Sequence, residues 1–203
     1  MSRAIYWLMI LASLFGIAAC SGMLDSDQPA ERVYWLEPLI VQQTGVADGA
    51  LPSLALSVSA APGLDTDRLL ILGPGARLNH FAAARWAGDI REVLESLLRT
   101  TLESTGRYSR VTAGPASRST DWVLELEVRE LYALADASET ADRVRFVLNG
   151  YVSCPETDHR IATQAVAGID DNRLGQIVAA YQRTLHEVSL QLVTQLADTC
   201  QDY

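Results

Sequence analysis

Three consecutive segments in the second half of the chain alternate apolar and polar residues, and this alternation constrains the fold more than any other feature. The segments are Asp121–Tyr132, Arg143–Ser153 and His159–Gly168. A period of two is typical of a β-strand with one buried and one solvated face, as in antiparallel sheets. Short turns separate the segments, so we expect a meander. The residues expected on its buried face include Trp122, Leu124, Leu126, Val128, Val144, Phe146, Leu148 and Val152.

Two other segments have a helical period. In Asp89–Ser104 the apolar residues recur at steps of three and four, with Asp89 suited to cap the first turn and Gly106 to end the last. A longer amphipathic segment follows Asp170–Asn172. One apolar stripe on each helix and one polar face on each strand favour helices packed on one side of a sheet. The sequence therefore predicts an α+β fold, a two-layer sandwich of a largely antiparallel sheet with two long helices packed on one face.

The first half of the mature region contains shorter runs of strand-forming residues. Val33–Leu36, Ser53–Ser59 and Arg68–Leu72 are predicted as strands. The glycines and proline of Gly73–Gly75 predict a turn, after which Arg77–Phe81 returns as the hairpin partner of Arg68–Leu72.

The segment Met1–Cys20 has the character of an export signal. Arg3 precedes a long apolar run that is shorter than the roughly 20 residues of a membrane-spanning helix, and Ala18 and Ala19 come just before Cys20. The ending resembles the lipobox of bacterial lipoproteins, in which the cysteine becomes the first residue and carries acyl chains. The alternative is ordinary cleavage near Ala19, which leaves a free thiol.

We therefore expect residues 1–19 to be a lipoprotein signal peptide and residues 20–31 to be a lipidated Cys20 followed by a polar tether. Several acyl chains would anchor the chain durably, since one chain binds a bilayer only marginally. Ser21 stands where a retention-type aspartate could follow the cysteine, and by analogy with bacterial sorting rules this indicates the outer membrane, with the domain facing the periplasm.

Composition excludes several functional classes. All 16 basic residues are arginines, so a lysine Schiff base and a phosphate-binding Walker lysine are both excluded. The formal net charge is -9, which disfavours a broad electrostatic contact with nucleic acid or anionic lipid headgroups. We expect neither nucleic acid nor a broad surface of anionic headgroups as an electrostatic partner.

Cys154 and Cys200 remain once Cys20 is assigned to the anchor. Export passes the chain through a compartment that permits disulfides, so we predict that these two cysteines pair. The bond would close a loop of roughly 45 residues and stabilise the fold by about 4 kcal/mol in the chain-entropy model. Two unpaired thiols remain the alternative.

The residue patterns of catalysis and metal binding are absent from the sequence. His80, His159 and His186 stand at no metal-ligand spacing, and no serine lies in a GxSxG elbow. The carboxylate pairs Asp65/Asp67 and Asp170/Asp171 suit loops and helix caps. We therefore predict no catalytic residues, no metal, no cofactor and no enzymatic activity.

One cluster of polar and aromatic residues is a candidate partner-contact surface. It consists of Asn79, His80 and Phe81, followed by Arg85 and Trp86 just before the first long helix. The alternative is that Trp86 is buried under the start of that helix.

The segment around this cluster resembles a known family. The run Leu64–Leu72, then Phe81, then Arg85–Ala87 and a leucine-rich helix is similar to the auxiliary lipoprotein component of ABC-type transporters, as are the lipobox and the terminal helix. The family pattern has proline and glutamine where Leu69–Leu70 stands, and an acidic-proline step where Gly88–Asp89 stands. On this resemblance, residues 32–203 form an ABC-transport auxiliary lipoprotein domain.

The resemblance implies a non-enzymatic accessory subunit. Its partners would be a mammalian-cell-entry domain protein and an ABC permease with a separate ATPase, in a system that moves lipids or organic solutes. Exposed strand edges or the entry to the first long helix would be the contact surfaces, and the resemblance also allows a homo-oligomeric ring. The alternatives are a lipoprotein regulator of envelope or peptidoglycan synthesis and a periplasmic hydrolase.

Overall fold

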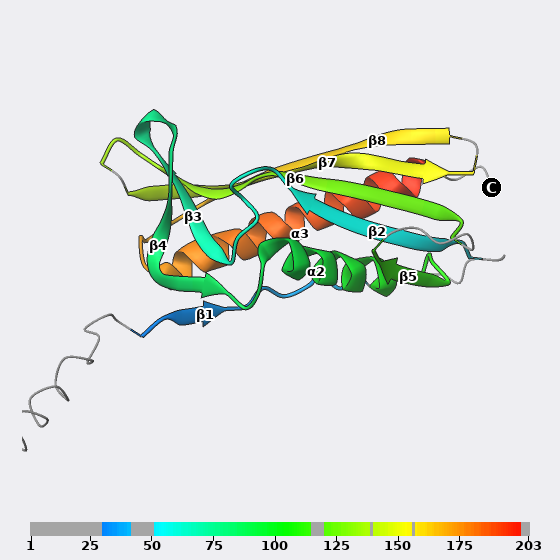
Figure 1. Cartoon of the computed structure of the whole chain (residues 1–203), viewed down its shortest axis with the longest axis horizontal. Helices are drawn as coiled ribbons and strands as arrows, with labels where there is room; N and C mark the ends of the chain where they lie inside the picture. Colours follow the sequence, from blue (N-terminus) through cyan, green and yellow to red (C-terminus); the bar gives the residue numbers. More distant parts are fainter. Residues whose placement is uncertain (1–29, 42–50, 115–119, 139, 156, 200–203) are drawn as a thin grey trace, which may run out of the picture. The chain divides into compact units, whose positions relative to one another are not determined.

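The alternating segments form the three longest strands of the sheet (Figure 1). In the computed structural model, which describes residues 30–41, 51–114, 120–138, 140–155 and 157–199, these strands are β6 (Trp122–Ala135), β7 (Ala141–Cys154) and β8 (Thr157–Gly168). Both pairings, β6 with β7 and β7 with β8, are antiparallel. The predicted meander is confirmed, with the predicted apolar residues on its buried face apart from the half-buried Trp122.

The other edge of β6 pairs with two different strands, so the sheet forks there. The first half of β6 runs parallel to β2 (Ser53–Ala60), which in turn pairs with β5 (Arg110–Ala113). The second half pairs with β3 (Arg68–Gly73). This arrangement is available because β6 has 14 residues, whereas β2 has 8.

Beyond β3, the sheet continues through β4 (Arg77–Trp86) to the short strand β1 (Arg32–Tyr34). The 3-10 turn η2 (Pro74–Ala76) connects β3 to β4 and confirms the predicted hairpin. Strand β4 extends further than predicted and includes Arg85 and Trp86. Strand β1 pairs with β4 in parallel.

Two helices cover one face of the sheet (Figure 1). Helix α2 (Ile90–Ser104) begins after Asp89, whose carboxylate accepts the N–H of Arg91 at 2.9 Å, and Gly106 follows its end at φ 62°. Helix α3 (Leu174–Thr199) packs against β7 and β8. The predicted α+β class is confirmed, with a mixed sheet whose longest pairings are antiparallel. The largest buried core side chains include Leu54, Leu56, Leu94, Leu98, Leu124, Phe146, Leu148 and Trp86.

A buried tyrosine of α3 joins the two strands at the fork. The hydroxyl of Tyr181 donates to the carbonyl of Leu70 in β3 at 2.6 Å and accepts the N–H of Ala133 in β6 at 2.9 Å. These contacts lie beside the first register pair of the two strands, Ile71 with Ala133. Burial raises the pKa of the Tyr181 phenol, so the hydroxyl keeps the proton that it donates.

Side-chain amides of α3 cover the outer edge of β8. Gln195 bonds both the N–H and the carbonyl of Ala162, at 3.2 and 2.9 Å, and Gln191 does the same for Gln164, at 3.1 and 3.0 Å. An edge strand otherwise offers these backbone groups to a strand of another chain. This part of the edge is therefore not one of the open strand edges expected as contact surfaces.

Cys154 is disulfide-bonded, whereas its predicted partner Cys200 lies outside the described residues. The pairing of these two cysteines therefore stays a prediction. Cys20 and the predicted signal peptide also lie outside them. Within the described ranges, no helix is both long and apolar enough to cross a membrane.

We expect the substitution Tyr181→Phe to lower the free energy of unfolding by about 2–4 kcal/mol, because it leaves a buried carbonyl and a buried N–H without their partner. Urea unfolding followed by circular dichroism measures the loss. Tyr151→Phe is the control, since Tyr151 is 57% exposed and its change should stay within about 0.5 kcal/mol. Equal effects of the two substitutions would contradict the bridging role.

A second prediction concerns Asp121, whose carboxylate accepts the N–H of Ser53 at 2.7 Å and its hydroxyl at 2.8 Å. These bonds lower the pKa of Asp121 in the folded chain. The stabilisation is thus present above the unfolded pKa of about 3.9 and is lost as the pH falls through the lower folded value. The stability difference between the unaltered chain and Asp121→Asn should shrink across this range in urea titrations at successive pH values. A constant difference would argue against the linkage.

Candidate functional site

The two segments that carry the family resemblance interlock in space. The N–H of Trp86 donates to the carbonyl of Asp67 at 2.7 Å, and the N–H of Ile90 donates to the carbonyl of Thr66 at 3.2 Å. The loop before β3 thereby fixes both the end of β4 and the start of α2. The hydroxyl oxygen of Thr66 also accepts the N–H of Arg68 at 3.2 Å.

A large bulge in β4 accompanies this arrangement. In the register with β3, Arg85 lies opposite Arg68 and His80 lies opposite Leu70, so four residues of β4 face a single residue of β3. Within the bulge Ala83 adopts φ 54°, a region that residues with a side chain rarely occupy. Beyond the bulge β4 pairs with β3 through Arg85 and with β1 through Ala84, Arg85 and Trp86.

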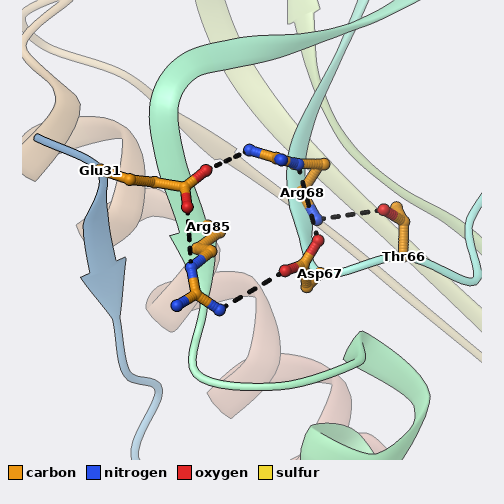
Figure 2. Close-up of polar contacts among 5 residues, drawn as sticks. All are labelled: Glu31, Thr66, Asp67, Arg68 and Arg85. Atoms are coloured by element: carbon orange, nitrogen blue, oxygen red, sulfur yellow. Dashed lines mark hydrogen bonds and ion pairs between the residues drawn. The ribbon is translucent and has the colours of Figure 1, made fainter. Parts of the chain in front are cut away.

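Two arginines and two carboxylates form a closed ionic network at this edge (Figure 2). Glu31 pairs with Arg68 and lies 3.1 Å from Nε of Arg85, while Asp67 lies 3.6 Å from each guanidinium. Because the sheet register sets Arg68 opposite Arg85, the two positive charges would otherwise repel each other. The two acids neutralise them, so the network as a whole carries no net charge.

A second pair of carboxyl groups lies at the start of α2. Burial is the main cause that raises the pKa of Asp89, and the neighbouring carboxyl of Asp65 raises it further. Arg91 opposes this through its backbone N–H at 2.9 Å from Asp89, and its guanidinium lies 3.8 Å from Asp65. A helix N-terminus favours negative charge, so Asp89 is explained by capping, and Asp65 is explained by its ion pair with Arg91.

The segment Glu31–Val41, which starts at the last residue of the predicted tether, bonds to both helices; we call it the strap. Gln182 of α3 accepts the N–H of Glu37 and donates to its carbonyl, both at 2.8 Å. The N–H of Val41 donates to the hydroxyl of Ser104 in α2 at 3.0 Å. The strap is therefore fixed to the ionic network at one end and to the two helices beyond it.

The structure separates the five candidate contact residues. Asn79 and His80 are exposed on the first half of β4, whereas Phe81 is half-buried and packs against the core. Arg85 belongs to the ionic network. Trp86 is 2% exposed and meets the ring of Tyr181 edge-on at 5.1 Å between centroids, so the alternative of a buried tryptophan holds and Trp86 is not part of a contact surface.

Sequence reasoning missed Glu31 and Gln182. Glu31 belongs to a polar stretch whose composition indicates only a tether, and Gln182 is one of several polar residues on an amphipathic helix. Both act on chain segments that are remote in sequence, by 37 residues for Arg68 and 145 residues for Glu37. A weak signal in the sequence was that Glu31 is an acidic residue placed directly before a run of strand-forming residues.

The face of the sheet opposite the helices holds a shallow groove of about 610 Å³. Tyr151, which is 57% exposed, stands in it among acidic and basic side chains. Such a lining suits polar contacts, because burial of an acyl chain needs an apolar wall. The charged and hydroxyl side chains of the groove are those of Ser57, Ser59, Glu125, Glu127, Arg129 and Arg160.

Two of the three histidines, His159 and His186, make ordinary polar contacts. Nε2 of His159 lies 2.8 Å from the hydroxyl of Thr157, and Nε2 of His186 lies 2.7 Å from the amide of Gln182. In the described part of the chain, no group of three or more His, Cys, Asp or Glu side chains is arranged to hold a metal ion.

Removal of the Glu31 charge tests the network. We expect Glu31→Gln to speed amide hydrogen exchange in β1 and the first residues of the strap, because Arg68 and Arg85 then repel each other. The global free energy of unfolding should fall by less than about 1 kcal/mol, since all four side chains are partly exposed. The matched control is Glu92→Gln, which removes an exposed ion pair with Arg91 and should leave exchange in β1 unchanged.

Solved structures share this fold. A protein of Xanthomonas campestris assigned to the family model DUF330 superposes with a TM-score of 0.68 at 18% identity, covering 81% of this chain and 94% of that one. A structure described only as an uncharacterized protein superposes with a TM-score of 0.66 at 11% identity, covering 83% of this chain and 99% of that one. At these identities the likeness concerns the fold alone. No curated protein sequence matches the chain.

The sequence itself matches a family model described as the ABC-type transport auxiliary lipoprotein component. The match covers residues 34–193, which include most of the strap, the interlocked segments, the whole sheet from β2 to β8 and most of α3. The chain therefore belongs to the ABC-type transport auxiliary lipoprotein component family.

Proposed function

We propose that this chain is the lipid-anchored accessory subunit, facing the periplasm from the outer membrane, of an ABC transport system that contains a mammalian-cell-entry domain protein. The system moves lipids or organic solutes between the two membranes, and this subunit has no catalytic step of its own. The family match over residues 34–193 carries the proposal. The signal-like Met1–Ala19 and the lipobox-like Cys20 support the anchor.

The polar character of the sheet groove supports a docking role over a lipid-carrying one. Its lining of carboxylates, guanidinium groups and hydroxyls is suited to a protein surface or another polar partner. The outer face of β6 carries charges of both signs, as in Glu127 and Arg129, which lie 2.9 Å apart. A partner with a complementary pattern would be recognised in one register, because like charges brought together are costly.

The tether explains how a weak docking contact can suffice. A chain extends by at most about 3.6 Å for each residue, so the span from Cys20 to Glu31 reaches no more than about 40 Å. Within that reach the domain meets its partner at a high effective concentration, which raises the occupancy of the complex without any added contact.

Crosslinking in native membranes, followed by affinity purification of the full chain and mass spectrometry, tests this function. We expect recovery of a mammalian-cell-entry domain protein together with an ABC permease. The variant Cys20→Ala should leave the membrane fraction and recover at least ten-fold less of both, since the tether then no longer concentrates the domain. Recovery of cell-wall synthases in place of transporter subunits would contradict the proposal and favour a regulator of envelope synthesis.

A further inference from the structure

The strap presents an apolar surface to solvent. Val33 is 52% exposed, Trp35 is 72% exposed and Ile40 is 59% exposed. Between them Tyr34 packs against the core and Leu36 is 2% exposed, as expected for an extended chain with alternate side chains on opposite sides. The side chains on one side of the strap thus complete the core, whereas Val33 and Trp35 on the other side are exposed to solvent.

These exposed side chains stand on a segment that is held in place. Strand β1 pairs with β4 in the register Val33 to Arg85 and Tyr34 to Trp86. Glu31 is fixed by two arginines before the strand, and Glu37 is fixed by the amide of Gln182 after it. A rigid segment loses little further conformational entropy when it binds, so its exposed apolar surface is well suited to an intermolecular contact.

Chain length and charge both indicate a bilayer as the occupant. The strap follows directly after the tether from Cys20, so Val33 and Trp35 lie within about 55 Å of that cysteine even when the chain between them is fully extended. Beside β1 the charges of Glu31, Asp67, Arg68 and Arg85 cancel within their network, and the exposed Arg32 of β1 itself is positive, so anionic headgroups meet no net negative charge at this place. Tryptophan is also the side chain that prefers the boundary between headgroups and acyl chains.

We propose that Val33 and Trp35 insert into the surface of the membrane that holds the acylated Cys20, and that this contact orients the domain on the bilayer. The inference rests on the lipid anchor of the proposed function. Insertion is driven by the apolar side chains and not by electrostatic attraction, since the chain has a formal net charge of -9. The contact is therefore insensitive to salt.

Quenching of tryptophan emission by brominated lipids tests this contact. The acylated full-length mature chain is reconstituted into vesicles of phosphatidylethanolamine and phosphatidylglycerol whose acyl chains carry bromine close to the glycerol or close to the terminal methyl. The mature chain keeps Trp35, Trp86 and Trp122, of which Trp86 is buried and Trp122 packs edge-on against Tyr108 at 5.8 Å. We expect bromine near the glycerol to quench part of the emission, equally at low and high salt.

The variant Trp35→Phe should lose the quenched component, whereas Trp122→Phe, the matched control, should keep it. Equal quenching in Trp35→Phe and the unaltered chain would overturn the inference. A chain that floats with the vesicles but shows no quenching would also overturn the inference. In that case, disulfide crosslinking between copies of the Trp35→Cys variant in such vesicles would assign the surface to self-association. A chain that does not float with the vesicles would instead contradict the lipid anchor. The experiment therefore distinguishes failure of the insertion proposal from failure of the proposed function.

Discussion

The fold depends on the hydroxyl of Tyr181, which bridges the two strands at the fork of the sheet. Its two hydrogen bonds, to Leu70 and to Ala133, join β3 to β6 where their pairing is only two residues long. The same ring packs edge-on against Trp86, so one side chain of α3 positions β3, β6 and the end of β4 together. The bridge adds directional bonds to the hairpin of β3 and β4, which core side chains such as Leu69 and Ala84 also hold to the rest of the sheet.

The edge of the sheet at β1 is built on that hairpin. The bulge in β4 sets Arg85 opposite Arg68, and the repulsion between them is relieved by Asp67 and by Glu31. These ion pairs fix Glu31, which is the first residue of the compact unit. The strap continues from Glu31 and bonds to α3 through Gln182. The segments that resemble the family pattern thus include the residues that fix Glu31 and the start of the strap to the sheet, which gives their residue types a structural reason.

The meander and both helices could be predicted from sequence because their evidence is local. A period of two in β6, β7 and β8 and a period near 3.6 in α2 and α3 each arise from one segment alone. The fork could not be predicted, because parallel pairing of β2 and β3 with β6 depends on contacts between distant segments. The role of Tyr181 was hidden as well, since a tyrosine in an apolar stripe indicates burial and says nothing about the partner of its hydroxyl.

The same distinction applies to the site. The composition of Asn79–Trp86 predicts one contact surface, but the members of this cluster divide between solvent, core and ion pairs because the bulge interrupts the alternation. Single polar residues that bond to segments remote in sequence, such as Glu31 and Gln182, leave no periodic signal.

We propose that this scaffold works at a membrane through an acylated Cys20. Intact mass spectrometry of the protein purified from its native membranes detects such a modification. We expect a chain that begins at Cys20, without residues 1–19, whose mass exceeds that of the polypeptide by the mass of its acyl chains. A chain of unmodified mass recovered from the soluble fraction would contradict it.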